Sequence, residues 1–71
     1  MRRRLRRYQL YVNGQYHGYE EGWDLTGPVA VVRLVAEIFG SDAAMRLRFK
    51  GNTGRTMEAG VPYEVRAEIV K

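Results

Sequence analysis

The chain has 71 residues and no cysteine, which limits it to one domain with a small core and excludes disulfides, thiolate metal sites and a cysteine nucleophile. A hydrophobic fraction of 45% and a charged fraction of 28% are typical of a folded domain and not of a disordered chain. The net charge of +4 comes from five N-terminal arginines, because residues 8–71 hold seven basic against eight acidic side chains and so carry a net charge of −1.

This uneven distribution divides the chain into a basic N-terminal arm, residues 1–7, and a single domain, residues 8–71. The one continuous apolar run, residues 28–39, is too short to span a bilayer. We therefore expect no membrane contact and a cytoplasmic location.

Residues 8–12 and 15–21 are predicted to form a β-hairpin. Both segments are rich in residues that favour strands, and Asn13-Gly14 between them is typical of a two-residue type I′ turn. Pairing across this turn predicts a face directed at the core that holds Tyr8, Leu10, Val12, His17 and Tyr19. The other face is expected to be open and to hold Tyr11 and Tyr16 beside Arg7, Gln9, Gly18 and Glu20.

Residues 28–39 are predicted to form a helix. Asp24 or Thr26 can cap its free N–H groups, Pro28 suits the first turn, and Gly40 is placed to end it. At about 100° per residue one wide arc is apolar, and its members are Val31, Val32, Leu34, Val35, Ile38 and Phe39. The opposite side holds Ala30, Arg33 and Glu37.

The rest of the chain alternates between apolar and polar residues and predicts strands. Residues 44–50 alternate Met45, Leu47 and Phe49 with Arg46, Arg48 and Lys50, and residues 63–69 alternate in the same way. Between them we expect a turn over 51–54, a short weak strand over 55–59 and a second turn over 60–62. The order ββαβββ predicts an α+β fold: a small antiparallel sheet with one amphipathic helix packed on one face and the other face open.

The arginine arm is the first candidate binding site. Guanidinium groups bind phosphate or carboxylate in a bidentate manner, and a run of them gives salt-sensitive affinity for RNA or DNA of any sequence. The members of this site are Arg2, Arg3, Arg4, Arg6 and Arg7. The alternative is that the run is a solvated start of the first strand.

Tyr11 and Tyr16 are the second candidate site, because bases of single strands stack on aromatic rings beside arginine. The alternative is a cross-strand aromatic pair that only stabilises the hairpin. Tyr19 and Trp23 are expected to plug one end of the core, whereas an exposed Trp23 would indicate an interface hot spot.

A third candidate lies in the glycine-containing segment after the predicted strand over 44–50. Lys50, Gly51, Gly54 and Arg55 place Gly-x-x-Gly between two cations, which is a candidate anion loop built from backbone N–H groups. The alternative is a four-residue hairpin turn. The basic residues just before it can pair with Glu64 and Glu68 if the last strand lies alongside.

Catalytic and metal chemistry find no support in the sequence. His17 is the only histidine, so a multi-histidine metal site is excluded, and we expect no metal and no cofactor. Glu20 and Glu21 are neighbours on a strand and point to opposite faces, so they cannot act as an acid/base pair. We expect a protein that is not an enzyme.

The sequence therefore favours a non-catalytic binding domain that contacts nucleic-acid phosphates through its arm. The alternative is a protein-interaction module, such as a small inhibitor or an assembly subunit from a mobile element or a ribonucleoprotein. It would dock on an acidic protein surface through its open sheet face or an edge strand. A homodimer joined through sheet edges is compatible with both.

Overall fold

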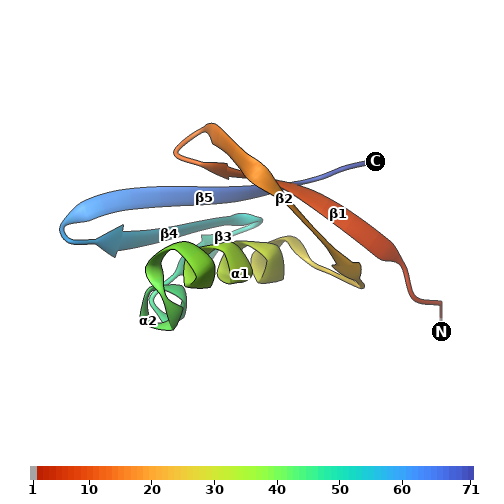
Figure 1. The fold of residues 1–71 in the computed structure, drawn as a ribbon, viewed down its shortest axis with the longest axis horizontal. Helices are drawn as coiled ribbons and strands as arrows, with labels where there is room; N and C mark the ends of the chain where they lie inside the picture. The colour runs from red at the N-terminus through yellow and green to blue at the C-terminus, as the bar shows by residue number, and fades with distance from the viewer. Residues whose placement is uncertain (1) are drawn as a thin grey trace.

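The computed structural model describes residues 2–71, which form a five-stranded antiparallel sheet with helices on one face (Figure 1). The elements in chain order are β1 (Leu5–Val12), β2 (Gln15–Trp23), α1 (Gly27–Phe39), α2 (Ser41–Met45), β3 (Arg48–Lys50), β4 (Thr53–Glu58) and β5 (Val61–Ile69). In the sheet the strand order is β2-β1-β5-β4-β3. The predicted α+β class and the order ββαβββ are confirmed, with one short helix added.

The β1–β2 hairpin turns at Asn13-Gly14 as predicted, and both residues have the positive φ that a type I′ turn requires. Its register changes farther along, because Tyr11 pairs with Tyr16 whereas Gln9 pairs with Tyr19. The extra residue is a β-bulge at Gly18, whose φ is +106°. The predicted core position of Tyr19 is therefore wrong, since the bulge moves every later side chain of β2 to the other face.

Helix α1 ends where the sequence predicts and begins one residue earlier, at Gly27. Thr26 is the N-cap and its Oγ1 accepts a hydrogen bond from the Val29 N–H at 3.4 Å, while Gly40 with φ +98° ends the helix. The predicted apolar arc is partly wrong, because Ala30 is fully buried and Val32 and Ile38 are exposed. The buried residues of the helix are Gly27, Ala30, Val31, Leu34 and Val35.

The predicted strand over 44–50 is wrong in its first half. Residues 41–45 form the single turn of α2, which buries Ala43 completely and leaves Met45 exposed. Strand pairing starts only at Arg48, so β3 has three residues. Burial of alanine, a strong helix former, against α1 outweighs the alternation of Met45, Leu47 and Phe49.

Strand β4 is longer than expected and pairs with β3 on one side and β5 on the other. The turn before it consists of Gly51-Asn52 alone, so the predicted four-residue turn is wrong: Thr53 and Gly54 already belong to the strand. Likewise β5 begins at Val61, directly after the Ala59-Gly60 turn. Because β4 separates β3 from β5, the predicted pairing of the β3 cations with Glu64 and Glu68 does not form.

The core lies between α1 and the sheet face that we call the inner face. Its largest fully buried side chains are Leu10, Val31, Val35 and Val65. No helix or strand among residues 2–71 covers the opposite, outer face (Figure 1). None of the helices in this range is long and apolar enough to cross a membrane.

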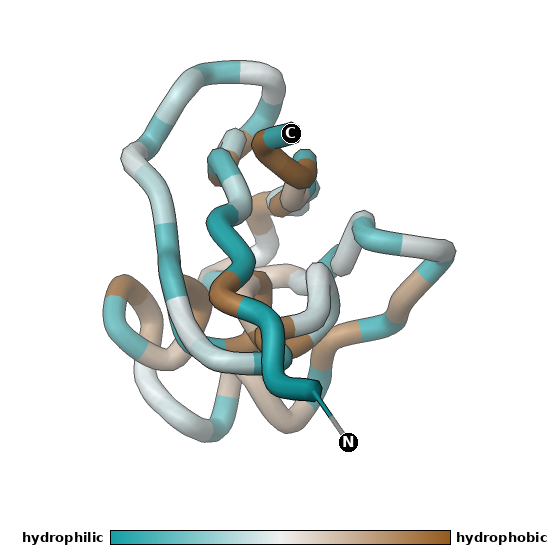
Figure 2. The backbone as a smooth tube through the Cα atoms, turned by 90° about the vertical axis from the view of Figure 1, so that its right-hand side faces the viewer, coloured by the Kyte–Doolittle hydropathy of each residue, from teal (hydrophilic) through white to brown (hydrophobic). Residues whose placement is uncertain are grey.

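The molecule is elongated, with extents of 42 × 22 × 20 Å. The chain begins at one end of the long axis, and the β4–β5 turn and α2 lie at the other end (Figure 1). The first residues form a strongly hydrophilic stretch that leads into β1 (Figure 2). The two ends of the molecule therefore present different surfaces.

Candidate nucleic-acid interface

The arginine arm is ordered by contacts within the domain. The Arg4 N–H donates to Asp24 Oδ1 at 3.0 Å, and the Asp24 N–H donates to the Arg4 carbonyl oxygen at 2.7 Å. Arg6 and Arg7 already belong to β1, where they pair with Gly22 and Glu21. Residues 2–4 thus extend the path of the strand toward one end of the molecule.

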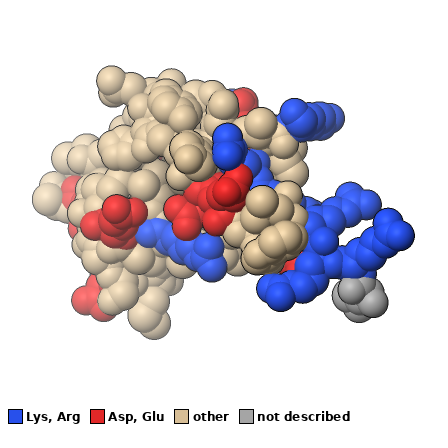
Figure 3. Space-filling view, turned by 45° about the vertical axis from the view of Figure 1, so that its right-hand side comes forward, with Lys and Arg blue, Asp and Glu red and all other residues tan. Residues whose placement is uncertain are grey.

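Two of the five arm guanidinium groups meet a carboxylate of the domain. Arg7 Nη2 lies 3.0 Å from Glu21 Oε2, and Arg3 Nε lies 3.7 Å from Asp24 Oδ2. Arg2, Arg4 and Arg6 have no ion-pair partner among residues 2–71. Unneutralised positive charge is thereby gathered where the chain begins, as the Lys and Arg side chains in Figure 3 show.

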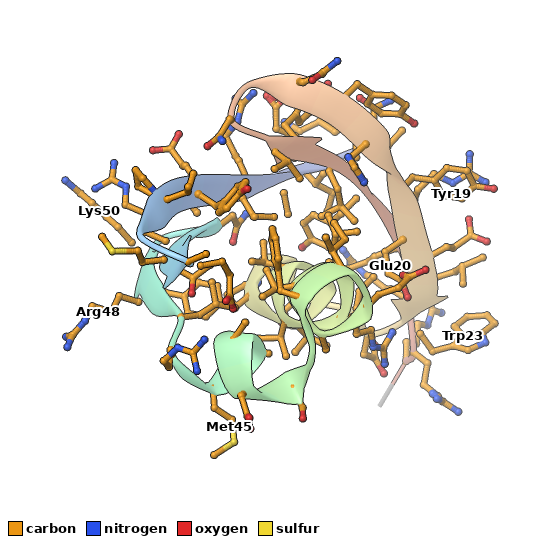
Figure 4. All side chains as sticks on the ribbon, turned by 60° about the vertical axis from the view of Figure 1, so that its left-hand side comes forward. Tyr19, Glu20, Trp23, Met45, Arg48 and Lys50 are labelled. Carbon is orange, nitrogen blue, oxygen red and sulfur yellow. The ribbon has the colours of Figure 1, made fainter. Side chains whose placement is uncertain are left out.

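Aromatic rings of β2 occupy the outer face next to these cations. Tyr16, Tyr19 and Trp23 are 53%, 55% and 58% exposed, although aromatic side chains of this size are usually covered. Figure 4 shows Tyr19 and Trp23 projecting away from β2, while Glu20 points toward α1. Tyr11 is half-buried and meets Tyr16 edge-on, with 5.7 Å between the ring centroids.

Three of these four rings have an arginine guanidinium group against them. The guanidinium carbon of Arg7 lies 4.5 Å from the centre of the Tyr19 ring, and that of Arg66 lies 4.7 Å from the Tyr11 ring. Arg3 lies 5.7 Å from the Trp23 ring. Arginine over an aromatic face is a cation–π contact, and it holds the guanidinium group on the same surface as the rings.

The outer face also carries acid. Arg66 Nη1 lies 2.9 Å from Glu68 Oε1, in addition to the Arg7–Glu21 pair. Glu20 belongs to the inner side, where its Oε1 lies 3.5 Å from Arg33 Nη1 of α1. The arginines stacked on the rings are therefore nearly balanced by carboxylates, and the unpaired positive charge of the arm belongs to Arg2, Arg4 and, on the inner side, Arg6.

The structure brings together most of the candidate residues and adds others. Tyr11, Tyr16 and Arg7 share the outer face as predicted, whereas Arg6 lies half-buried on the inner side opposite Gly22. Sequence analysis missed Tyr19 and Arg66 as members of this face and placed Trp23 in the core. The signal that could have found Tyr19 is Gly18, since glycine inside a strand often marks a bulge.

The candidate anion loop does not form as a loop. Gly51 lies in the turn, but Gly54 is buried in β4, where an added Cβ would lie 2.9 Å from Leu47 Cδ2 and 3.0 Å from Val31 Cγ1. A glycine is therefore required at position 54 because Leu47 and Val31 pack closely against the backbone there. Arg55 directs its guanidinium group to Glu64 at 3.0 Å.

Residues 2–71 contain no group of three or more acidic or histidine side chains placed to hold a metal ion. Glu20 and Glu21 lie on opposite faces of β2, as expected from their positions on one strand. Comparison with protein families, with curated proteins and with solved structures gives no match for this chain. Any functional assignment therefore depends on the geometry of the outer face.

Proposed function

We propose that this protein is a non-catalytic domain that binds single-stranded nucleic acid across its arginine arm and outer sheet face. The arm arginines bind phosphates, and the exposed rings of Tyr16, Tyr19 and Trp23 stack on bases. The observation that carries the proposal is this set of three exposed rings along one strand, flanked by guanidinium groups on a face without a helix.

The chemistry of the face favours single strands. Stacking on a side-chain ring requires a base that is unstacked from its neighbours, and each such contact contributes about 1–3 kcal/mol to binding. The rings stand on an edge strand of the sheet, where an extended strand of nucleic acid has unobstructed access. The arm supplies the cations that hold the backbone.

The intramolecular ion pairs weaken this proposal only slightly. In the Arg7–Glu21 pair the two side chains are 47% and 37% exposed, and in the Arg3–Asp24 pair they are 71% and 57% exposed. Ion pairs exposed to this degree contribute about 0–1 kcal/mol, so a phosphate can replace the carboxylate at little cost. Arg2, Arg4 and Arg6 have no such partner to release.

Salt dependence tests the contribution of the arm. For single strands each phosphate contact adds about 0.7 to the slope of log K against log salt concentration. We expect substitution of all five arm arginines by glutamine to flatten the slope for a single-stranded oligonucleotide, measured by fluorescence anisotropy. Undetectable binding of the unmodified protein at low salt would remove the proposal.

A charge-matched pair of variants locates the effect. One variant changes the unpaired arm cations, Arg2, Arg4 and Arg6, to glutamine, and the other changes Arg48, Lys50 and Lys71, which are also without an ion pair in the described chain. Both lose three positive charges. We expect only the first to lower the salt slope, by about 2; equal losses would show that net charge alone is responsible.

A second candidate function uses the same face. An exposed tryptophan beside arginine is also typical of a protein interface, so docking on an acidic protein assembly is the alternative. Retention of a partner after nuclease treatment would favour docking, and its loss would favour nucleic acid. For either function we propose a cytoplasmic location.

A further inference from the structure

A second surface lies at the opposite end of the molecule, beside α2 and β4. It is a groove with a volume of about 820 Å³, which we call the β4 groove. Its apolar lining includes Met45, Leu47 and Met57, and its cations are Arg46, Arg48 and Arg55. The groove lies far along the long axis from the arm, and Asn13 of the β1–β2 turn also lines it (Figure 1).

The groove exists because β3 is shorter than β4. Strand β3 pairs only with residues 53–55 of β4, so the following residues of β4 have no strand on that side. Alternate residues of an antiparallel strand direct their N–H and C=O groups to the same side. Thr53 and Arg55 direct their backbone groups toward β3. Met57, two residues farther along β4, therefore directs its backbone N–H and C=O to the same side, where no strand pairs with it.

Two methionines at the groove are exposed to solvent. Met45 is 85% exposed and Met57 is 59% exposed. Thr56 also contributes to the lining, and its buried hydroxyl has no hydrogen-bond partner among residues 2–71. Exposed methionines are common on surfaces that adapt to a partner.

The charge of the groove is positive. Arg46 is paired with Glu58 at 2.9 Å and Arg55 with Glu64 at 3.0 Å, whereas Arg48 has no ion-pair partner in the described chain. Figure 4 shows Met45 and Arg48 both projecting into solvent on the side away from Tyr19 and Trp23. A partner that covers the methionines thus meets one unneutralised guanidinium group.

We propose that the β4 groove binds an acidic polypeptide segment in an extended conformation. The segment adds to the sheet in line with β3 and forms backbone hydrogen bonds with Met57. Its apolar side chains cover Met45 and Met57, and a carboxylate pairs with Arg48. A polypeptide backbone supplies both the acceptor and the donor that a free strand edge requires, as in other cases of strand addition.

A second copy of this chain fits the groove less well. At one edge of the sheet, the glutamates of β2 are already engaged with Arg33 and Arg7 of the same molecule. At the other edge, β3 of each copy carries Arg48, which has no ion pair within residues 2–71, so pairing of two such edges would bring like charges together. The bulge at Gly18 also breaks the regular pairing that strand addition requires. The occupant is therefore a different polypeptide.

The test uses short peptides in which glutamate alternates with valine, with lysine in place of glutamate in the control series. Binding to the full chain is followed by the amide signals in nuclear magnetic resonance. We expect the glutamate peptides to shift the signals of Thr56, Met57 and Glu58 and to protect the Met57 amide from hydrogen exchange. The lysine peptides should leave them unchanged.

Two variants locate the interaction. Arg48→Glu should weaken peptide binding about tenfold, which corresponds to loss of one charge-assisted hydrogen bond. Lys50→Glu is the matched control, because it makes the same charge change two residues along β3 but does not line the groove. Met57→Pro removes the free N–H without removing a bond to β5, because the backbone N–H of this residue is directed to the open side, and it should weaken peptide binding as measured by the shifts of the Thr56 and Glu58 amide signals.

Three results would overturn the proposal. The first is that neither peptide series shifts the β4 signals, and the second is that Lys50→Glu weakens binding as much as Arg48→Glu. The third is that these signals move with protein concentration or with an oligonucleotide instead of a peptide. Loss of oligonucleotide binding at the arm would leave peptide binding unaffected, so the two proposals fail independently.

Discussion

Alternate residues of the same strands build the two faces of this sheet. On the inner face Tyr8, Leu10 and Val65 are buried against α1 and are held by packing alone. On the outer face the intervening residues Arg7 and Arg66 lie in ion pairs and against rings, and their side chains remain partly exposed to water. Packing without water fixes one arrangement, whereas exposed polar contacts can be exchanged for those of a ligand.

The largest difference between the faces should appear on truncation of a side chain. Leu10→Ala removes a side chain that is 2% exposed, and we expect it to lower the free energy of unfolding by about 2–5 kcal/mol. Tyr19→Ala removes a larger side chain from the outer face, yet only a cation–π contact is lost, so the expected decrease is below about 1 kcal/mol. Urea unfolding followed by circular dichroism measures both.

For oligonucleotide binding we expect the opposite order, with a larger effect of Tyr19→Ala than of Leu10→Ala. Tyr19→Ala should weaken binding about tenfold, which is the effect of losing one stacked base. The folded fraction of Leu10→Ala should bind normally, because Leu10 does not reach the outer face. If Tyr19→Ala destabilises as much as Leu10→Ala, then Tyr19 has a structural function and the separation of the faces is wrong.

Substitution of Gly18 should change the free energy of unfolding by an intermediate amount. The bulge at this residue determines on which face of the sheet Tyr19 lies. Gly18 has φ +106°, a conformation that an L-residue adopts only under strain. We expect Gly18→Ala to destabilise the protein by about 1–3 kcal/mol and to perturb the amide signals of β2 beyond the bulge.

Gly22→Ala is the control in the same strand. An added Cβ there would lie 3.6 Å from Arg33 Nη1 and 3.7 Å from Leu25 Cβ, which are ordinary contacts. The expected change in unfolding free energy is under about 0.5 kcal/mol. Equal effects at both positions would contradict a special function for the bulge.

The bulge also marks the limit of sequence-based prediction for this chain. Local signals with a single physical meaning were sufficient: Asn13-Gly14 specified the turn and Gly40 the end of α1, whereas the choice between Asp24 and Thr26 as its cap was settled only by the structure. Gly18 has two possible meanings in a strand, either a missing side chain or an inserted residue, and only the pairing with β1 distinguishes them. Because a one-residue shift moves all later side chains, this one ambiguity misplaced Tyr19.

The C-terminal half shows a second kind of limit. Met45, Leu47 and Phe49 alternate as in a strand, but the packing of Ala43 against α1 determines the structure there, and packing partners are not visible in a short segment. The same applies to the two proposed binding surfaces. The basic character of the arm and the outer-face position of Tyr16 could be predicted from composition and pairing, whereas the β4 groove depends on the different lengths of β3 and β4.

The smallest expected effect compares two neighbouring carboxylates that lie on opposite faces. Glu21→Gln removes the partner of Arg7 on the outer face, so we expect oligonucleotide affinity to rise about twofold to fivefold while stability changes by less than about 1 kcal/mol. Glu20→Gln makes the same change in net charge on the inner side, next to Arg33. At 0.15 M salt, where charges are screened beyond about 8 Å, it should have a much smaller effect on affinity. Equal increases in fluorescence-anisotropy titrations would mean that the overall charge of the domain, and not the outer face, controls binding.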